Sequence, residues 1–347
     1  ETSCDETAAA VVKENTDGTG EILSNIVSSQ IEEHREFGGV VPEIAARAHV
    51  EKIEFIVQKA IKESNLNLEN LDGIAATAGP GLIVCLTVGL NTGKAIAGSL
   101  NKPFIAVNHL EGHALSPKIN NKIEFPYLLL LISGGHTQFL EVNGVNNYRR
   151  LGTTIDDALG EAFDKTAKLL GIEFPGGPKI EEWAKKGDKN YFTLPKPILK
   201  KGGCNLSFAG LKTAVLRTSK KLKNEKEKYH LAASFQKTIN EILYEKTRVA
   251  MKEFLKNKKN RQNTFVIAGG VASNLSIREN LTKLAKEKNF TSIFPPINLC
   301  SDNAAMIAWT GIERYKINLI DNLEFPSKAR WPLDSSAPFL KGSGLKF

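Results

Sequence analysis

The stretch of sequence that decides the fold reads Phe104-Ile105-Ala106-Val107-Asn108-His109-Leu110-Glu111-Gly112-His113. Its first four residues form an apolar run with strand character, and Asn108 is a good helix N-cap, so a strand-to-helix turn is predicted here. Two histidines at positions i and i+4 of a helix point to one face and can hold a single metal ion. Open α/β sheets bind ligands at such turns.

The spacing of the two histidines is similar to that of zinc proteases, but the glutamate is displaced. The protease pattern H-E-x-x-H has glutamate directly after the first histidine, whereas here Leu110 follows His109 and Glu111 comes next. A protease-type general base is therefore misplaced. A helix whose histidines merely cap or pack is the alternative that the pair alone leaves open.

Apolar runs alternate with helical patterns on both sides of this stretch. The expected strand and helix pairs are 74–78 with 86–100, 104–107 with the histidine helix, and 127–133 with 157–170. Further along, a helix is expected over 229–256 and a strand over 265–268. The alternation predicts an α/β fold, and 347 residues exceed the usual size of a single core, so we expect two lobes.

Composition limits the class of protein. The formal net charge of +8 suits an anionic partner such as a nucleotide or RNA, although coding bias toward lysine produces the same excess. The four cysteines have no C-x-x-C spacing, which favours a reducing compartment over a disulfide framework or zinc ribbon. The longest apolar run, 127–132, is too short to span a bilayer, so a soluble protein with no membrane partner is expected.

Two glycine-rich turns follow predicted strands and could hold phosphate. The first is Leu131-Ile132-Ser133-Gly134-Gly135-His136-Thr137 and the second is Ala268-Gly269-Gly270-Val271-Ala272-Ser273-Asn274. Glycine lets the backbone approach an anion, and a following helix N-terminus favours negative charge. Residues 89–95 superficially resemble a P-loop, but the glycines are one residue too close and Ala95 stands where magnesium needs Ser or Thr. No Rossmann fingerprint is present. The two turns indicate a nucleotide cleft.

A longer series of ordered motifs makes the pattern specific. The chain contains, in this order, ETSCDET from Glu1, GGVVPE from Gly38, GPGL from Gly79, VNHLEGH from Val107, SGGHT from Ser133, DALGEAFDK from Asp157, PGGP from Pro175, SFAGLKT from Ser207, GGVASN from Gly269 and SDNAAM from Ser301. This series resembles the TsaD/Qri7 family, the tRNA N6-adenosine threonylcarbamoyltransferases once described as O-sialoglycoprotein endopeptidases. The resemblance spans about nine-tenths of the chain.

The resemblance implies the fold of actin, hexokinase and Hsp70 (ASKHA), with two ribonuclease-H-like lobes around a nucleotide cleft. We expect lobes at 1–125 and 126–347, with a helix near 302–317 packing back on the first lobe and a first strand that is incomplete before Glu1.

The resemblance also implies the site residues. His109, His113 and Asp302 would bind one iron or zinc ion, and Asp5 or Glu6 is our hypothesis for the residue that assists deprotonation of the attacking amine. The remaining positions match the family's site for threonylcarbamoyl-AMP: Leu131, Ile132, Ser133, Gly134, Gly135, Asp164, Gly177 and Asn274.

The implied reaction transfers threonylcarbamoyl from threonylcarbamoyl-AMP to the exocyclic amine of the tRNA adenosine 3′ to the anticodon, and releases AMP. The implied partners are tRNA with TsaB- and TsaE-like proteins in a bacterial cytoplasm, or a homodimer if the protein is mitochondrial. Basic tracts at 196–201 and 252–261 could guide tRNA or serve only solubility. A metalloendopeptidase, an ASKHA enzyme acting on a small molecule and a non-catalytic scaffold are the alternatives.

Overall fold

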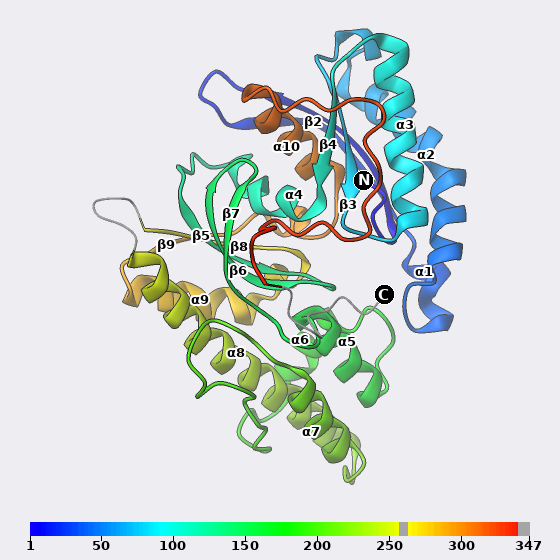
Figure 1. The fold of residues 1–347 in the computed structure, drawn as a ribbon. Helices are drawn as coiled ribbons and strands as arrows, with labels where there is room; N and C mark the ends of the chain where they lie inside the picture. Colours follow the sequence, from blue (N-terminus) through cyan, green and yellow to red (C-terminus); the bar gives the residue numbers. More distant parts are fainter. Residues whose placement is uncertain (257–262, 339–347) are drawn as a thin grey trace. The chain divides into compact units, whose positions relative to one another are not determined.

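The computed structural model describes residues 1–256 and 263–338. The chain forms two compact units (Figure 1). The first unit contains residues 1–124, 144–147 and 301–335, and the second contains the other described residues. The chain passes from the first unit to the second after residue 124 and returns to the first at residue 301, which brings α10 (Ala304–Lys316) into the first unit.

The first unit is built on two pairs of strands. β1 (Glu6–Glu14) and β2 (Gly20–Ser29) are antiparallel, and β3 (Ile74–Gly79) and β4 (Phe104–Asn108) are parallel. Helices and 3-10 turns complete the unit: α1 (Ile31–His34), η1 (Arg35–Phe37), α2 (Pro42–Ser64), η2 (Leu68–Asn70), α3 (Ile83–Leu100), α4 (His109–Leu115), η3 (Ser116–Lys118) and α10. The β3–α3 and β4–α4 pairs are those predicted from the apolar runs.

The second unit has one mixed sheet of five strands in the order β7-β6-β5-β8-β9. β5 and β6 are antiparallel, whereas β5, β8 and β9 are parallel. The strands are β5 (Tyr127–Ile132), β6 (Thr137–Gly144), β7 (Asn147–Thr153), β8 (Thr264–Ala268) and β9 (Thr291–Ile293). Helices and 3-10 turns of the unit are α5 (Leu159–Leu170), α6 (Gly177–Ala184), α7 (Ala209–Ser219), α8 (Glu225–Leu255), η4 (Gly270–Ser273), α9 (Leu275–Glu287) and η5 (Ile297–Leu299).

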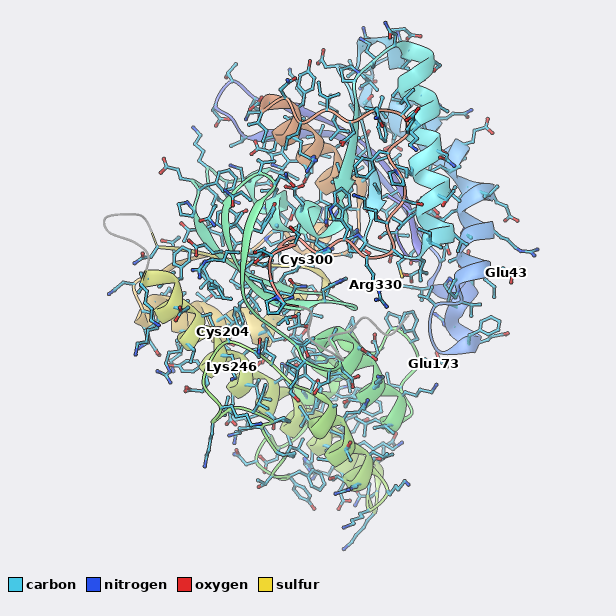
Figure 2. The ribbon with its side chains drawn as sticks, viewed as in Figure 1. Glu43, Glu173, Cys204, Lys246, Cys300 and Arg330 are labelled. Atoms are coloured by element: carbon cyan, nitrogen blue, oxygen red, sulfur yellow. The ribbon has the colours of Figure 1, made fainter. Side chains whose placement is uncertain are left out.

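The core of the second unit explains the uniformly apolar sequence of its central strands. Every residue of β5 is buried, because helices and neighbouring strands cover it, and its Tyr-Leu-Leu-Leu-Leu-Ile sequence has no polar alternation. α8 contributes a long buried face to the same core. Lys246 of α8 is buried too, and its Nζ donates to the carbonyls of Lys201 and Gly203, at 3.0 and 3.2 Å, beside Cys204 (Figure 2).

The glycines that superficially resemble a P-loop lie inside α3, where they serve close packing. A Cβ at Gly93 would stand 2.8 Å from Cβ of Ala76, and one at Gly89 would stand 2.5 Å from Oγ1 of Thr2. The helix therefore approaches β3 and the N-terminal segment too closely for a larger residue. Among the described residues, α3 alone has the length and apolar composition of a membrane-crossing helix. α3 packs on β3 and α2, and core helices of soluble proteins have the same length and composition. These properties of α3 are therefore weak evidence for a membrane span.

The four cysteines are free, as the absence of paired spacing predicts. Cys204 and Cys300, labelled in Figure 2, both belong to the second unit. Burial raises the pKa of the Cys204 thiol to about 11, so the thiol stays protonated near neutral pH. The cysteines therefore do not act as a disulfide framework in this fold.

Candidate active site

The histidine helix begins where the sequence predicts it. The Asn108 side chain caps α4 by accepting a hydrogen bond from the backbone N–H of Leu110 at 2.9 Å. β4 is fully buried and ends at Asn108, so His109 and His113 project from the first turns of a helix anchored by a core strand. Both histidines are buried.

Asp302 reaches the histidines because α4 and α10 pack closely together. A Cβ at Gly112 would lie 2.9 Å from Cδ1 of Ile307, so the glycine lets the two helices approach without displacing that side chain. Asn303 caps α10 by accepting from the N–H of Met306 at 3.0 Å. Asp302 directly precedes this cap and is thereby held against α4.

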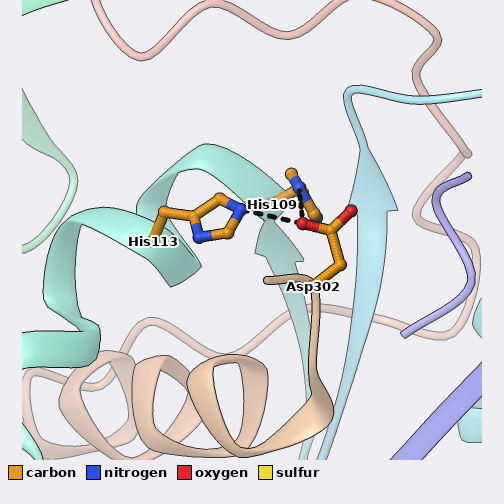
Figure 3. A group of neighbouring side chains, drawn as sticks. All are labelled: His109, His113 and Asp302. Atoms are coloured by element: carbon orange, nitrogen blue, oxygen red, sulfur yellow. Dashed lines mark hydrogen bonds and ion pairs between the residues drawn. The ribbon is translucent and has the colours of Figure 1, made fainter. Parts of the chain in front are cut away.

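The three predicted metal ligands meet at one point of the first unit (Figure 3). Oδ1 of Asp302 lies 3.0 Å from Nε2 of His113 and 3.4 Å from Nε2 of His109. The three ligand atoms all lie within 4.8 Å of one another. Two imidazoles and one carboxylate that converge in this way are the donor set of many divalent metal sites.

The charges of the triad are strongly coupled. Burial by itself lowers the pKa of His109, but the carboxylates of Asp302 and Glu1 outweigh it and raise that pKa well above its usual range. Burial likewise raises the pKa of Asp302, while the charge of His109 and hydrogen bonds from both imidazoles bring it well below its usual range. The Asp302 carboxylate thus favours a positive charge on His109, at the place where a metal cation would face that carboxylate.

The donor set fits a metal ion for a second reason. Nδ1 of His113 is buried and has no hydrogen-bond partner in the described part of the chain, so this ring is not fixed by a contact on its far side. Its Nε2 lies 3.0 Å from Oδ1 of Asp302. A bound cation would give the two buried imidazoles and the partly buried carboxylate a common partner.

Glu111, which lies between the two histidines in the sequence, is occupied elsewhere. Its carboxylate pairs with Nη1 of Arg314 at 2.8 Å and accepts from the backbone N–H of Asn146 at 2.7 Å. Both side chains of the ion pair are buried. The glutamate therefore links α4 to α10 and to the 144–147 turn, and it is not placed as a protease-type general base.

Asp5 and Glu6 lie in the same unit as the triad, at the start of β1. Asp5 is buried, and its side chain is hydrogen-bonded with that of Glu6. Burial, together with the charges of Asp302 and Asp5, raises the pKa of Glu6 well above its usual range. These effects disfavour the charged form of the Glu6 carboxyl group.

The two glycine-rich turns lie side by side in the second unit. β5 and β8 are parallel neighbours with Leu131 opposite Ala268, so the turns that follow them leave the same edge of the sheet. The backbone N–H groups of Gly134 and Gly135 make no hydrogen bond within the described residues, and a Cβ at either glycine would meet nothing within 4 Å. These amides can receive an anion.

The other residues of the first turn are structural. Leu131 and Ile132 are fully buried in β5, and the N–H of Ser133 donates to the carbonyl of His136 at 2.8 Å. The Ser133 hydroxyl accepts from the N–H of His136 at 3.1 Å. Only the two glycines of the predicted 131–135 segment therefore offer free amides.

The remaining predicted nucleotide residues lie on three helices of the second unit. Asp164 of α5 accepts from the N–H of Gly176 at 2.9 Å, and Gly177 is the first residue of α6. Asn274 caps α9 by accepting from the N–H of Ile277 at 2.9 Å, and its Nδ2 donates to Gln236 at 2.9 Å. One Nδ2 proton of Asn274 remains for a ligand.

The sequence reasoning missed one contact of the metal triad. Glu1 accepts a hydrogen bond from Nδ1 of His109 at 3.0 Å. In the sequence, Glu1 is the first residue of the ETSCDET motif, and no role was predicted for it. The partners are separated by 108 residues along the chain, so no local spacing signals the contact.

Comparison with known proteins identifies the family. Residues 21–309 match the family model of TsaD, described as tRNA N6-adenosine threonylcarbamoyltransferase. Proteins of that name from Pelagibacter ubique and Rhodospirillum rubrum are 67% and 52% identical to this chain. The matches cover 100% and 99% of this chain and 97% and 96% of those proteins. The chain belongs to the TsaD family. The family and enzyme class expected from the motifs are thereby confirmed.

The expected ASKHA architecture of this TsaD-family chain is confirmed by solved structures. HypF from T. kodakarensis matches with a TM-score of 0.56 and 15% identity over 77% of this chain and 44% of that one. Component A of the (R)-2-hydroxyglutaryl-CoA dehydratase of Acidaminococcus fermentans has a TM-score of 0.50 and 15% identity over 88% and 92%. At these identities the likeness is one of fold alone.

Proposed function

We propose that this TsaD-family chain transfers the threonylcarbamoyl group of threonylcarbamoyl-AMP to the exocyclic amine of the adenosine 3′ to the anticodon, in tRNAs that read ANN codons. The observation that carries the proposal is 67% identity to a curated tRNA N6-adenosine threonylcarbamoyltransferase over the full length of the chain. The motifs that hold the candidate site residues are part of this match.

His109, His113 and Asp302 would hold one iron or zinc ion. When bound, such an ion supplies Lewis acidity toward oxygen atoms of a ligand. The support is the convergence of the two Nε2 atoms on Oδ1 of Asp302. Glu111 takes no part in this role, because it is paired with Arg314.

The second unit would bind the nucleotide part of threonylcarbamoyl-AMP. The free amides of Gly134 and Gly135, in the turn between β5 and β6, suit the phosphate, as free backbone N–H groups of a turn can bind an anion. The Asp164 carboxylate suits the ribose hydroxyls, and Gly177 and the remaining Nδ2 proton of Asn274 suit the rest of the nucleotide. Leu131, Ile132 and Ser133 would hold this turn in place, Leu131 and Ile132 through their burial in β5 and Ser133 through its hydrogen bonds with His136.

The chemistry requires one bond to form and one to break. The adenine amine attacks the carbamoyl carbon, the new C–N bond forms, and the bond from that carbon to the phosphate oxygen of AMP breaks. The amine loses a proton, and Glu6 or Asp5 would accept it. A carboxyl group with a raised pKa, such as Glu6, is a more effective base near neutral pH than an ordinary one.

The bacterial relatives favour the bacterial arrangement of partners. We therefore propose a cytoplasmic enzyme that works with TsaB- and TsaE-like proteins and tRNA, in preference to a mitochondrial homodimer. Of the two basic tracts, Lys196 is already paired with Glu241 and Lys256 with Glu253. Residues 257–262 lie outside the described residues.

The deciding experiment measures transfer of labelled threonine from preformed threonylcarbamoyl-AMP to tRNA. The metal-loaded protein is assayed with and without the accessory proteins, and His109→Ala is the control. We expect tRNA labelling that His109→Ala abolishes. Absence of labelling under every partner condition, with nucleotide still bound, would favour a small-molecule ASKHA enzyme or a scaffold, and metal-dependent peptide cleavage would favour an endopeptidase.

The same assay tests the proton acceptor. We expect Glu6→Gln or Asp5→Asn to lower turnover at least tenfold at saturating substrate, because general-base catalysis commonly contributes about 10²–10⁴-fold. Near-normal turnover in both variants would show that neither carboxylate accepts the proton.

A further inference from the structure

The carboxylate of Glu1 contacts the metal triad through His109, on the side of the ring away from Asp302. Its Oε2 lies 3.0 Å from Nδ1 of His109, the ring nitrogen opposite to the one that faces Asp302. The Glu1 side chain is 1% exposed and that of His109 is 10% exposed, so water does not compete for this hydrogen bond.

The carboxylate of Glu1 is itself fixed by two donors from the first unit. Oε2 accepts from the hydroxyl of Thr77, a residue of the buried end of β3, at 2.6 Å. Oε1 accepts from the backbone N–H of Ser3 at 2.6 Å. The side chain therefore has one orientation, set by a core strand and by its own turn, and it presents one oxygen to the imidazole.

This arrangement fixes which ring nitrogen of His109 donates to Glu1 and which one faces the metal site. When a metal ion displaces the Nε2 proton, an imidazole that donates its Nδ1 proton to a carboxylate binds the ion through the Nε2 lone pair, and the negative charge of the carboxylate makes that lone pair more basic. His113 has no equivalent, because its Nδ1 lacks a partner among the described residues. The two histidines of the triad are thus supported unequally.

We infer that Glu1 is a positioning residue for the metal site: it orients His109 and strengthens its donation to the ion. The inference rests on the metal site of the proposed function. It adds Glu1, which lies outside the two motifs that contain the metal ligands, VNHLEGH and SDNAAM. The hydroxyl of Ser3 also lies 3.1 Å from Nδ1 of His109, and it is the competing candidate for the same role.

The test measures metal affinity and needs no transferase activity. Zn²⁺ affinity is measured by chelator competition for the wild-type protein, Glu1→Gln and Ser3→Ala. The d–d absorption spectrum of bound Co²⁺ reports ligand geometry in the same proteins. Glu1→Gln keeps the size and the hydrogen-bonding oxygen of the side chain but removes its charge. We expect Zn²⁺ affinity to fall about 10–100-fold and the Co²⁺ spectrum to shift.

The matched control is Glu141→Gln, which removes a buried carboxylate charge in the second unit, where Glu141 pairs with Arg149. Its Zn²⁺ affinity is expected to equal that of the wild type. Wild-type affinity and spectrum in Glu1→Gln, or a loss confined to Ser3→Ala, would overturn the inference. A wild-type protein that binds neither metal would overturn the metal site as well, whereas tRNA labelling would still judge the transferase separately.

Discussion

Gly269 shows how much a single residue contributes to the nucleotide edge of the second unit. Its φ of +95° lies in the left-handed region, and a Cβ there would stand 2.4 Å from the carbonyl oxygen of Ile132. The turn after β8 can therefore lie against the end of β5 only if residue 269 has no side chain.

We expect Gly269→Ala to lower the free energy of unfolding by at least about 2 kcal/mol, because it adds backbone strain to a clash with main-chain atoms. Urea denaturation measures the loss. Gly270→Ala is the matched control, since its Cβ would meet nothing within 4 Å, and its cost should stay below about 1 kcal/mol. Equal losses in the two variants would contradict this account.

Individual site residues differ in how far the sequence could reveal them. His109 and His113 share a helix face, so their spacing alone predicts that they meet, and Asn108 as the cap follows from the same rule. Asp302 was placed by the family motif. Glu1 could not be placed, because its contact with His109 depends on how the first turn of the chain lies against β3.

At the scale of elements, the α4–α10 contact organises the metal triad. The buried pair between Glu111 and Arg314 joins the two helices at 2.8 Å, and Gly112 allows their backbones to approach. α4 carries both histidines and α10 follows Asp302, so the geometry of the site depends on this helix pair.

We expect Arg314→Met to destabilise the protein by about 3–5 kcal/mol, because it leaves the Glu111 carboxylate buried without its cation. The double variant Glu111→Gln/Arg314→Met should recover part of this loss, since it removes the unpaired charge. Urea denaturation of the single and double variants measures both effects. Arg248→Met, which breaks the exposed pair with Glu245, is the control and should cost less than about 1 kcal/mol. If Arg314→Met lost as little unfolding free energy as Arg248→Met, the Glu111–Arg314 pair would not be what stabilises the contact between α4 and α10.

The strands were predicted unevenly, and the reason is their pattern. β3, β4, β5 and β8 are apolar runs with turns behind them, and their positions were expected within one or two residues. The β6–β7 hairpin and the β1–β2 pair were not expected, because their polar residues interrupt the apolar pattern: β7 reads Asn-Tyr-Arg-Arg-Leu-Gly-Thr. Such strands are specified by pairing with neighbours more than by their own composition.

At the scale of the whole molecule, the residues named for each candidate ligand site belong to a single unit. The triad belongs to the first unit, and the two glycine turns belong to the second. Binding of metal and binding of nucleotide should therefore be separable by mutation.

We expect His109→Ala to lose Zn²⁺ binding at least tenfold and to keep wild-type affinity for AMP. Gly135→Glu should weaken AMP binding at least tenfold and keep wild-type affinity for Zn²⁺. The added carboxylate would stand beside the free amides that suit the phosphate and would repel it. Isothermal titration calorimetry of both variants with each ligand measures the four affinities. Loss of both ligands in either variant would show that the two sites are not independent.

The order in which the metal ligands occur along the chain has a consequence for biosynthesis. His113 and Asp302 are 189 residues apart, and nearly the whole second unit is translated between them. At about 5–20 residues per second, a ribosome takes about 10–40 s to cover that distance. The nascent chain therefore carries two histidines without their carboxylate partner while nearly all of the second unit is synthesised, and it can complete its metal site only after that.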